Sequence, residues 1–264
     1  MVKEEKLQVG AMRSDPPFET VAQDLGKSLV FLCDHASNFV PEWIGNGSLG
    51  LSQADMERHI AYDIGARGLT LKLIEQMGGA GVLSKFSRLV IDPNRGEDDP
   101  TLVMRLYDGT IIPRNRNVDD GELERRLNAF HRPYHKAVSE MIDQMGAPVL
   151  ISIHSFTPQL QGKAPRPWHI GVLSAGDRRI ADLLLERLDR EPDICTGDNV
   201  PYVGSLEGDC MSQHGLSRNL PHVLIEVRND LISTEAGETE WAGRLVPILN
   251  DVIATYRKKE SENG

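Results

Sequence analysis

The stretch SLVFLCDH (residues 28–35) decides how the chain is expected to fold. Its apolar run, LVFLC at 29–33, is typical of a strand buried on both faces of a sheet, and it ends abruptly in Asp34 and His35. Three later apolar runs also end in, or contain near their end, a polar residue: Asp92, His154 and Glu226. Because isolated charges are costly to bury, we expect these residues to pair with one another or to bind a ligand.

Strands that alternate with helices are expected along most of the chain. Apolar runs predict strands at about 28–34, 81–86, 88–92, 149–153, 169–174 and 223–227. Helical spacing of apolar residues predicts helices at about 52–77, 121–145, 177–190 and 235–258. This alternation favours an α/β fold with a mostly parallel or mixed sheet that helices cover on both faces.

The chain is expected to form a single domain over residues 1–264, because no segment reads as a linker. Residues 1–26 are polar and contain Pro16-Pro17, so we expect an arm that packs late or loosely. The last residues, 259–264, are expected to be a frayed tail.

Composition limits the classes of function. The formal net charge of -10 argues against a general nucleic-acid-binding surface. No apolar run approaches the roughly 18 residues that a membrane-spanning helix needs, and the charged start lacks the apolar segment of a signal peptide. The cysteines at 33, 195 and 210 are far apart and indicate free thiols in a reducing compartment. We therefore expect a cytoplasmic protein with no nucleic-acid or membrane partner.

The polar residues that follow the apolar runs indicate a metal site. In open α/β sheets, ligands bind outside the carboxyl ends of the strands. His35 and His154 would both lie there, and Glu226 would occupy a similar position in its own strand. Two histidines and several carboxylates at one edge are a reasonable set for a metal ion with a general base.

Five segments resemble the N-formylglutamate amidohydrolase (deformylase) family and, more distantly, zinc carboxypeptidases and the aspartoacylase and succinylglutamate desuccinylase enzymes. They are DHASNFVP (34–41), HIAYDIGA (59–66), FSRLVIDPNR (86–95), ISIHSF (151–156) and VLIEVRND (223–230). The resemblance implies a three-layer α/β/α domain with a mixed sheet. It also implies metal-dependent hydrolysis of the amide bond of a small acidic N-acyl amino acid, with N-formylglutamate as the first substrate to test.

The resemblance implies one Zn²⁺ per chain, with His35 and His154 as ligands. Asn38 stands where the distant relatives carry a ligand glutamate, so the resemblance points to Asp63 as the third ligand. His59, four residues earlier, is an alternative ligand or a buttress of Asp63. Two histidines and one carboxylate would leave the fourth position open, as a catalytic zinc site requires.

Further roles follow from the same resemblance. Glu226 matches the general base, and Arg88 and Arg95 match residues that bind a substrate carboxylate or polarise the scissile carbonyl, with Asn94 in support. The histidine motif reads His35-Ala36-Ser37 rather than HSG, which places the chain in a divergent branch. Two other functions stay open: hydrolysis of a different amide or peptide-like substrate, and binding of a ligand without catalysis.

Two further patterns carry less weight. GNGSLG (45–50) matches GxGxxG but does not join a strand to a helix, so we do not expect a nucleotide site there. His131 and His135 are four residues apart without the glutamate of HExxH, and we expect them to pack or hydrogen-bond on one helix face. Whether His135 lines the pocket is left open.

Overall fold

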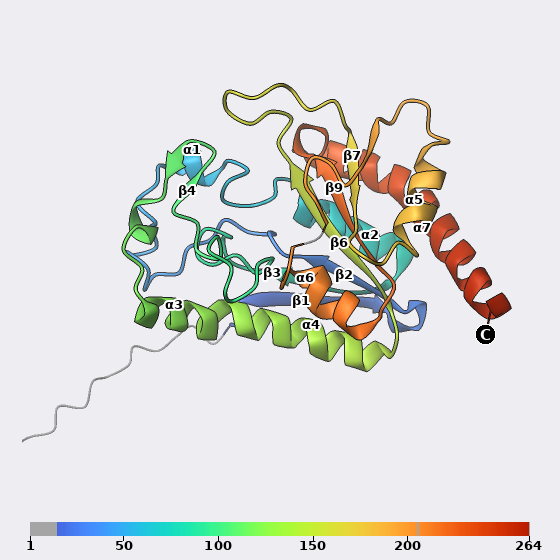
Figure 1. Ribbon diagram of the computed structural model, residues 1–264, viewed down its shortest axis with the longest axis horizontal. Helices are drawn as coiled ribbons and strands as arrows, with labels where there is room; N and C mark the ends of the chain where they lie inside the picture. Colours follow the sequence, from blue (N-terminus) through green and yellow to red (C-terminus); the bar gives the residue numbers. More distant parts are fainter. Residues whose placement is uncertain (1–14, 205, 264) are drawn as a thin grey trace, which may run out of the picture.

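A mixed sheet of seven strands forms the centre of the computed structural model, which describes residues 15–204 and 206–263 (Figure 1). The strand order is β1-β3-β2-β6-β9-β7-β8. Strands β3, β2, β6 and β9 run parallel, whereas β1 is antiparallel to β3 and β7 is antiparallel to β9. The bounds are β1 Phe18–Asp24, β2 Leu29–Cys33, β3 Gly79–Ser84, β6 Val149–Phe156, β7 Ile170–Leu173, β8 Thr196–Asp198 and β9 His222–Arg228, with a separate pair β4 Leu106–Tyr107 and β5 Thr110–Ile111.

Helices cover both faces of the sheet and give the expected three-layer α/β/α architecture. One layer holds α2 (Ala66–Met77), α5 (Ala181–Leu188) and α7 (Glu235–Asn263). The other layer holds α4 (Arg132–Met145) and α6 (Cys210–His214). The remaining helical segments are α1 Gln53–Met56, α3 Asp120–Arg126, a π-helix at Leu127–His131 and 3-10 turns at Leu25–Lys27, Pro113–Asn115, Leu216–Arg218 and Asn229–Leu231.

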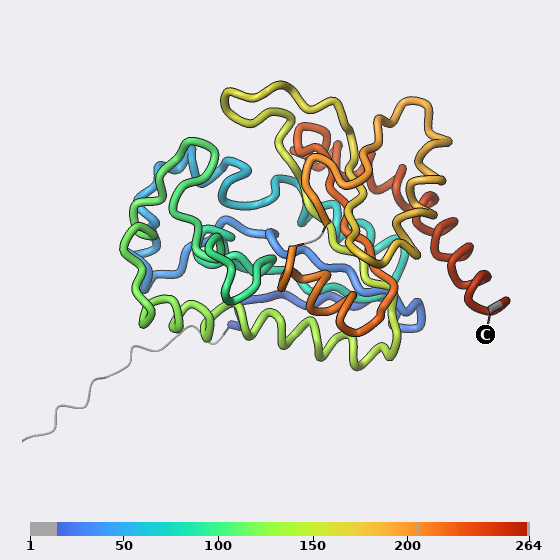
Figure 2. The backbone as a smooth tube through the Cα atoms, in the orientation of Figure 1, coloured from blue at the N-terminus to red at the C-terminus, as the bar shows by residue number. Residues whose placement is uncertain are grey.

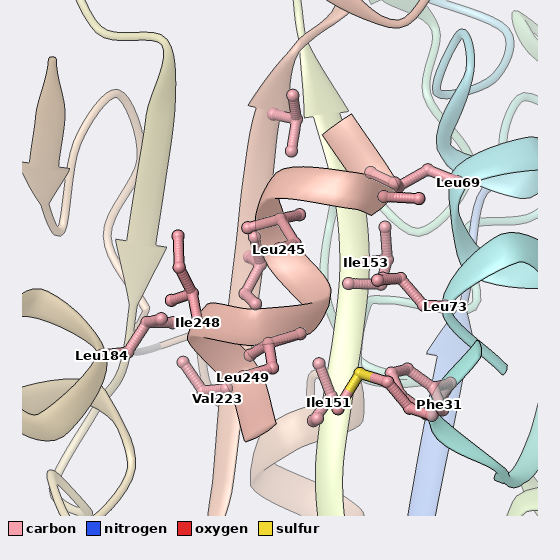
Figure 3. Packing of buried hydrophobic residues seen from close by; sticks show 14 of the residues in the cluster. Phe31, Leu69, Leu73, Ile151, Ile153, Leu184, Val223, Leu245, Ile248 and Leu249 are labelled. Carbon is pink, nitrogen blue, oxygen red and sulfur yellow. The ribbon is translucent and has the colours of Figure 1, made fainter. Parts of the chain in front are cut away.

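Aliphatic side chains fill the space between the sheet and the α2–α5–α7 layer (Figure 3). Leu73 from α2 and Leu245 from α7 pack over Ile151 and Ile153 of β6. All four side chains are fully buried. Each such burial stabilises the fold by roughly 1.5–3 kcal/mol, so the central strands form a rigid platform for the residues at their carboxyl ends.

Most of the predicted elements are confirmed. The runs at 28–34, 149–153, 169–174 and 223–227 form β2, β6, β7 and β9, and 81–86 overlaps β3. Asp119 caps α3 by accepting a hydrogen bond from the Glu122 amide. Helix α4 ends at Gly146, as its sequence predicts.

The expected strand at 88–92 is wrong, because this segment forms a buried turn. The Ser87 hydroxyl accepts a hydrogen bond from the Leu89 amide and favours the turn. Two side chains take the place of a neighbouring strand: the Asn115 amide donates to the Leu89 carbonyl and Arg126 donates to the Val90 carbonyl, both at 2.8 Å. An apolar run can therefore be fully buried without joining the sheet.

The single helix expected at 52–77 is also wrong, because α1 ends at Met56 and α2 begins at Ala66. Turns occupy the interval, and Gly65 has a left-handed φ of 79°. This break carries Asp63 toward the edge of the sheet, where its amide donates to the His35 carbonyl at 3.0 Å.

The described residues nearest the two ends of the chain are more ordered than the sequence indicates. Residues 18–24 form the edge strand β1, in which Phe18 and Val21 are half-buried, so they are not a loose arm. Residues 259–263 continue α7 rather than fraying. The first part of the expected arm, residues 1–14, lies outside the described residues. Within residues 15–204 and 206–263, no helix combines the length and apolar character needed to cross a bilayer.

A lobe of irregular chain lies beside the sheet. Segments near residues 40–60 and 95–120 run close together at the left of the view in Figure 2. Ile44, Leu49, Leu102 and Ile112 from these segments are buried in one cluster, which explains why so much irregular chain stays in place. This lobe forms one side of the site described below.

Gly65→Ala should destabilise the protein more than Gly146→Ala, although both glycines have φ near 80°. A methyl group at residue 65 would lie 1.9 Å from the Ile232 carbonyl oxygen, whereas one at residue 146 meets no described atom within 4 Å. The left-handed conformation costs about 1 kcal/mol for alanine, and the clash at residue 65 should add about 1–3 kcal/mol. Urea denaturation of both variants measures the difference, and equal losses would contradict the close contact.

Candidate metal centre and active-site cavity

Two histidines at the carboxyl ends of neighbouring strands face the same carboxylate. His35 follows β2 and places its Nδ1 3.3 Å from Asp63 Oδ2, and His154 in β6 places its Nδ1 2.9 Å from the same oxygen. The two rings meet edge to face with centroids 4.9 Å apart. All three side chains are at most 4% exposed. The structure therefore brings together the three residues that the sequence predicts as metal ligands.

The second nitrogen of each histidine is held by a further carboxylate. His35 Nε2 lies 2.7 Å from Asp92 Oδ1, and His154 Nε2 lies 3.1 Å from Asp34 Oδ2. In metal sites, a ligand histidine usually donates its other ring N–H to such a partner, which fixes the ring and makes it a stronger ligand. Both histidines are thus oriented with Nδ1 toward Asp63.

The two outer carboxylates have partners of their own. Asp34 accepts a hydrogen bond from the Tyr134 hydroxyl at 2.6 Å and one from Ser152 Oγ at 3.3 Å. Asp92 accepts two hydrogen bonds from Arg88, at 3.0 and 2.7 Å. These contacts explain why a buried strand is followed by an acid and an imidazole side by side: His35 faces the centre of the site, and Asp34 orients the histidine of the next strand.

Asp63 is fixed by the backbone around it. Its Oδ2 accepts a hydrogen bond from the Ser155 amide at 3.1 Å, and Ser155 Oγ donates to the Ile64 carbonyl at 2.8 Å. His59, the alternative third ligand, lies 3.3 Å from Asp108 instead. The helix expected at 52–77 would place His59 and Asp63 on one face, but residues 57–65 are not helical. The Asn38 side-chain amide donates to the Met56 carbonyl, so it links the segment after β2 to the end of α1.

Charge within this cluster favours a cation. Burial opposes ionisation of Asp34, Asp63 and Asp92, yet their imidazole and guanidinium partners hold the pKa of each carboxyl below its usual value. Arg88 supplies one positive charge against these three negative ones. In the metal-free protein, burial also opposes a charged His154, but its hydrogen bonds to Asp34 and Asp63 raise its pKa well above the ordinary value. The cluster thus attracts positive charge to Asp63.

The donor set suits a divalent metal ion. The ligand atoms of His35, Asp63 and His154 all lie within 4.8 Å of one another. Two imidazoles and one carboxylate are a ligand set found in catalytic zinc sites. A divalent ion would also bring the charge of the three aspartates and Arg88 to zero when the histidines are neutral.

Glu226 lies directly beside this centre. It is paired in register with His154 across β6 and β9, so both side chains project from the same face of the sheet. The side chain is 6% exposed, and its Oε2 has no hydrogen-bond partner within the described residues. Burial raises the pKa of Glu226 to about 7, and the charge of Asp63 adds to the increase.

A cavity of about 380 Å³ opens over the cluster. The residues that the sequence predicts for the site and that line it are His35, Asp63, Arg88, Asn94, Arg95, His154 and Glu226. Arg95 donates to Thr101 Oγ1 and to the Asn94 carbonyl, and Asn94 Oδ1 accepts from the Cys210 amide. Sequence reasoning gave no role to Tyr107 and Tyr202, which line the cavity, nor to Tyr134 behind it. Tyr134 lies a hundred residues from Asp34, and no local pattern marks it.

Comparisons with known proteins identify the family and the fold of the chain. The sequence model of N-formylglutamate amidohydrolase matches residues 27–233. The structure resembles that of a gene product from Agrobacterium tumefaciens, with 31% sequence identity, a TM-score of 0.85 and coverage of 92% of this chain and 97% of that one. It also resembles N-formylglutamate amidohydrolase from Ralstonia eutropha JMP134 in fold, with 22% identity, a TM-score of 0.61 and coverage of 93% and 100%. No curated protein sequence matches the chain.

Glu226→Gln should change how the stability of the metal-free protein depends on pH. The folded pKa of about 7 exceeds the ordinary value of 4.5, so between these values the folded state binds more protons than the unfolded state. Wild-type stability should therefore fall as pH rises through this window. Glutamine does not titrate, so the free energy of unfolding of the variant relative to wild type should rise by up to roughly 3 kcal/mol between pH 4.5 and 8. Chelator-treated samples in urea test this, and a constant difference would contradict the raised pKa.

Proposed function

The chain belongs to the N-formylglutamate amidohydrolase family, and on that premise we propose that it hydrolyses the amide bond of a small acidic N-acyl amino acid in a metal-dependent reaction. N-formylglutamate is the first substrate to test. The observation that carries the proposal is the placement of Glu226, a buried carboxyl group with a raised pKa, in register with His154 of the His35–Asp63–His154 cluster. Metal ligands and a proton acceptor thus share one cavity.

In this proposal His35, Asp63 and His154 hold one Zn²⁺ per chain. When bound, such an ion acts as a Lewis acid that polarises a carbonyl oxygen and makes water more acidic. Asp34 and Asp92 act through the histidines, because each holds one imidazole in the orientation that points Nδ1 at Asp63.

Glu226 serves as the general base. It takes a proton from the attacking water, whose oxygen forms a bond to the acyl carbon, and it delivers that proton to the amide nitrogen as the carbon–nitrogen bond breaks. The products are a carboxylate, formate in the case of N-formylglutamate, and the free amino acid. Glu226 suits both steps because its buried Oε2 has no hydrogen-bond partner within the described residues, so it can accept the proton and release it again.

Arg88 and Arg95 have separate roles in binding the substrate. Arg88 is fixed by its two hydrogen bonds to Asp92, and its Nη1 lies 3.6 Å from Asp63 Oδ1, so its charge is held at the edge of the metal centre. There it polarises the scissile carbonyl and helps to position the substrate. Arg95 lines the same cavity and binds a substrate carboxylate. Asn94 supports Arg95 by accepting a hydrogen bond at its carbonyl.

The metal-loaded protein should release the free amino acid from N-formyl-L-glutamate faster than from N-formyl derivatives of neutral amino acids, and it should release glutamate from other N-acyl glutamates in the same amino-group assay. Glu226→Gln keeps the size of the side chain but removes the proton acceptor, so kcat should fall by roughly 10²- to 10⁴-fold. At the pH of the assay, the metal content and the circular dichroism spectrum of the variant should stay near those of wild type. Undiminished turnover in this variant would end the assignment of Glu226, and no turnover on any N-acyl amino acid by wild type would favour a non-catalytic ligand-binding protein.

Asp63→Asn should lower the metal content at this site, because it replaces a charged ligand with a neutral amide. Asn38→Ala is the matched control, since Asn38 bonds only to the Met56 carbonyl within the described residues and should leave the metal content unchanged. Elemental analysis after dialysis against a weak chelator measures both variants. The opposite order would place the third ligand on the segment after β2.

A further inference from the structure

A second group of buried metal-ligand side chains lies between α4 and α6. His131 and His135 are one helical turn apart where the π-helix at Leu127–His131 joins α4, and Cys210 and His214 are one turn apart in α6. All four side chains are at most 9% exposed. The sequence predicts only packing or hydrogen bonding for His131 and His135, and a free thiol for Cys210.

This group is compact. His135 Nδ1 lies 2.8 Å from His214 Nε2, and the two rings are stacked with centroids 5.1 Å apart. The His131 ring lies 4.4 Å from the His135 ring. One nitrogen from each of His135 and His214 and the sulfur of Cys210 lie within 4.8 Å of one another. Helices α4 and α6 therefore bring a thiol and two imidazoles together, with the His131 ring beside that of His135.

Hydrogen bonds within the described residues leave two ring nitrogens of this group without a partner. The bond between His135 and His214 uses one nitrogen of each ring, and His131 Nε2 lies 2.9 Å from the Arg95 carbonyl. His135 Nε2 and His131 Nδ1 are buried and have no hydrogen-bond partner among the described residues. A buried polar atom without a partner destabilises the folded protein. The π-helical turn that ends at His131 is a second indication of a ligand site, since such turns are frequent at functional sites.

The donor atoms favour metal binding over anion binding, because one thiol sulfur and two imidazole nitrogens lie within 4.8 Å of one another. Burial lowers the pKa of His135 to about 3 and that of His214 to about 4, so both imidazoles are neutral at pH 7 and carry a lone pair. Burial also raises the pKa of the Cys210 thiol, with a further contribution from Asp34. A cation that accepts sulfur and nitrogen ligands would bind as the thiol loses its proton to solvent.

We propose that His135, Cys210 and His214 form a second metal site, structural in role, for a Zn²⁺-type ion. Zn²⁺ bonds of about 2.0–2.3 Å in a tetrahedron place ligand atoms roughly 3.3–3.6 Å apart. The 2.8 Å between His135 and His214 would need to widen by about half an ångström, which side-chain rotation supplies. This site depends on neither the activity nor the metal content of the His35–Asp63–His154 centre.

The second site would brace one wall of the cavity. Asn94 and Asp209 line the cavity, the Cys210 amide donates to Asn94 Oδ1, and Asp209 caps α6 through the Ser212 amide. An ion bound to residues of both α4 and α6 would hold this wall in position. Because the set contains a thiol and the first centre does not, the two sites differ in a property that spectroscopy can separate.

Replacement of bound metal by Co²⁺ in the full-length protein tests the proposal. A cysteine thiolate bound to Co²⁺ gives a strong near-ultraviolet charge-transfer absorption that histidine and carboxylate ligands alone do not give. We expect this absorption and about two metal ions per wild-type chain. Cys210→Ala should remove the absorption and one equivalent of metal, and His214→Gln should weaken or remove both. Circular dichroism of each variant establishes that it is folded.

Two control variants locate the thiolate. Cys33→Ala removes another buried thiol and Cys195→Ser removes the exposed one, and both should keep the absorption. The double variant His35→Ala, His154→Ala should lose one metal equivalent yet keep the absorption, which separates this proposal from the function proposed above. Wild-type protein that binds Co²⁺ without the thiolate absorption would overturn the second site, as would an absorption that survives Cys210→Ala.

Discussion

The shared carboxylate of Asp63 is the constraint on which the rest of the site depends. One oxygen of this carboxylate lies within 3.3 Å of imidazole nitrogens from two neighbouring strands and also accepts the Ser155 amide. A buried negative charge is stable only with such partners or with a cation. Asp34 and Asp92 add two more buried charges behind the histidines, so the group as a whole requires positive charge at its centre. Arg88 supplies part of it, and a divalent ion would supply the remainder.

The packed sheet offsets the free-energy cost of burying so many polar groups at one edge. Strands β2, β6 and β9 are adjacent and parallel, so their carboxyl ends bring His35, His154 and Glu226 to the same edge of the sheet. Apolar packing against α2 and α7 holds the strands in place (Figure 3), and the cost of burying several ionisable groups is offset by that core rather than by the site itself.

The parts of the site that the sequence predicts are those attached to strands. An apolar run with a polar residue at its end specifies both a buried strand and the edge where that residue emerges, and this placed His35, His154 and Glu226. Asp63 was chosen from family resemblance, and its expected helical setting was wrong, because turns that end at Gly65 are fixed by contacts with distant backbone. The strand predicted before Asp92 is absent for a similar reason. Its backbone carbonyls accept hydrogen bonds from the side chains of Asn115 and Arg126, which lie far along the chain. Partners such as Tyr134 cannot be read from local periodicity at all.

Asp34 connects the two groups of metal-ligand side chains. Its carboxylate orients His154 in the first group, and its charge helps to raise the pKa of the Cys210 thiol in the second. Loss of the Cys210 proton would place a second negative charge near Asp34 in a region that is fully buried. That charge could persist only with a cation bound to the sulfur, so thiolate formation and metal binding at the second group must occur together. The Tyr134 hydroxyl donates a hydrogen bond to Asp34 and so stabilises part of its negative charge. This leaves the other carboxylate oxygen of Asp34 to hold His154.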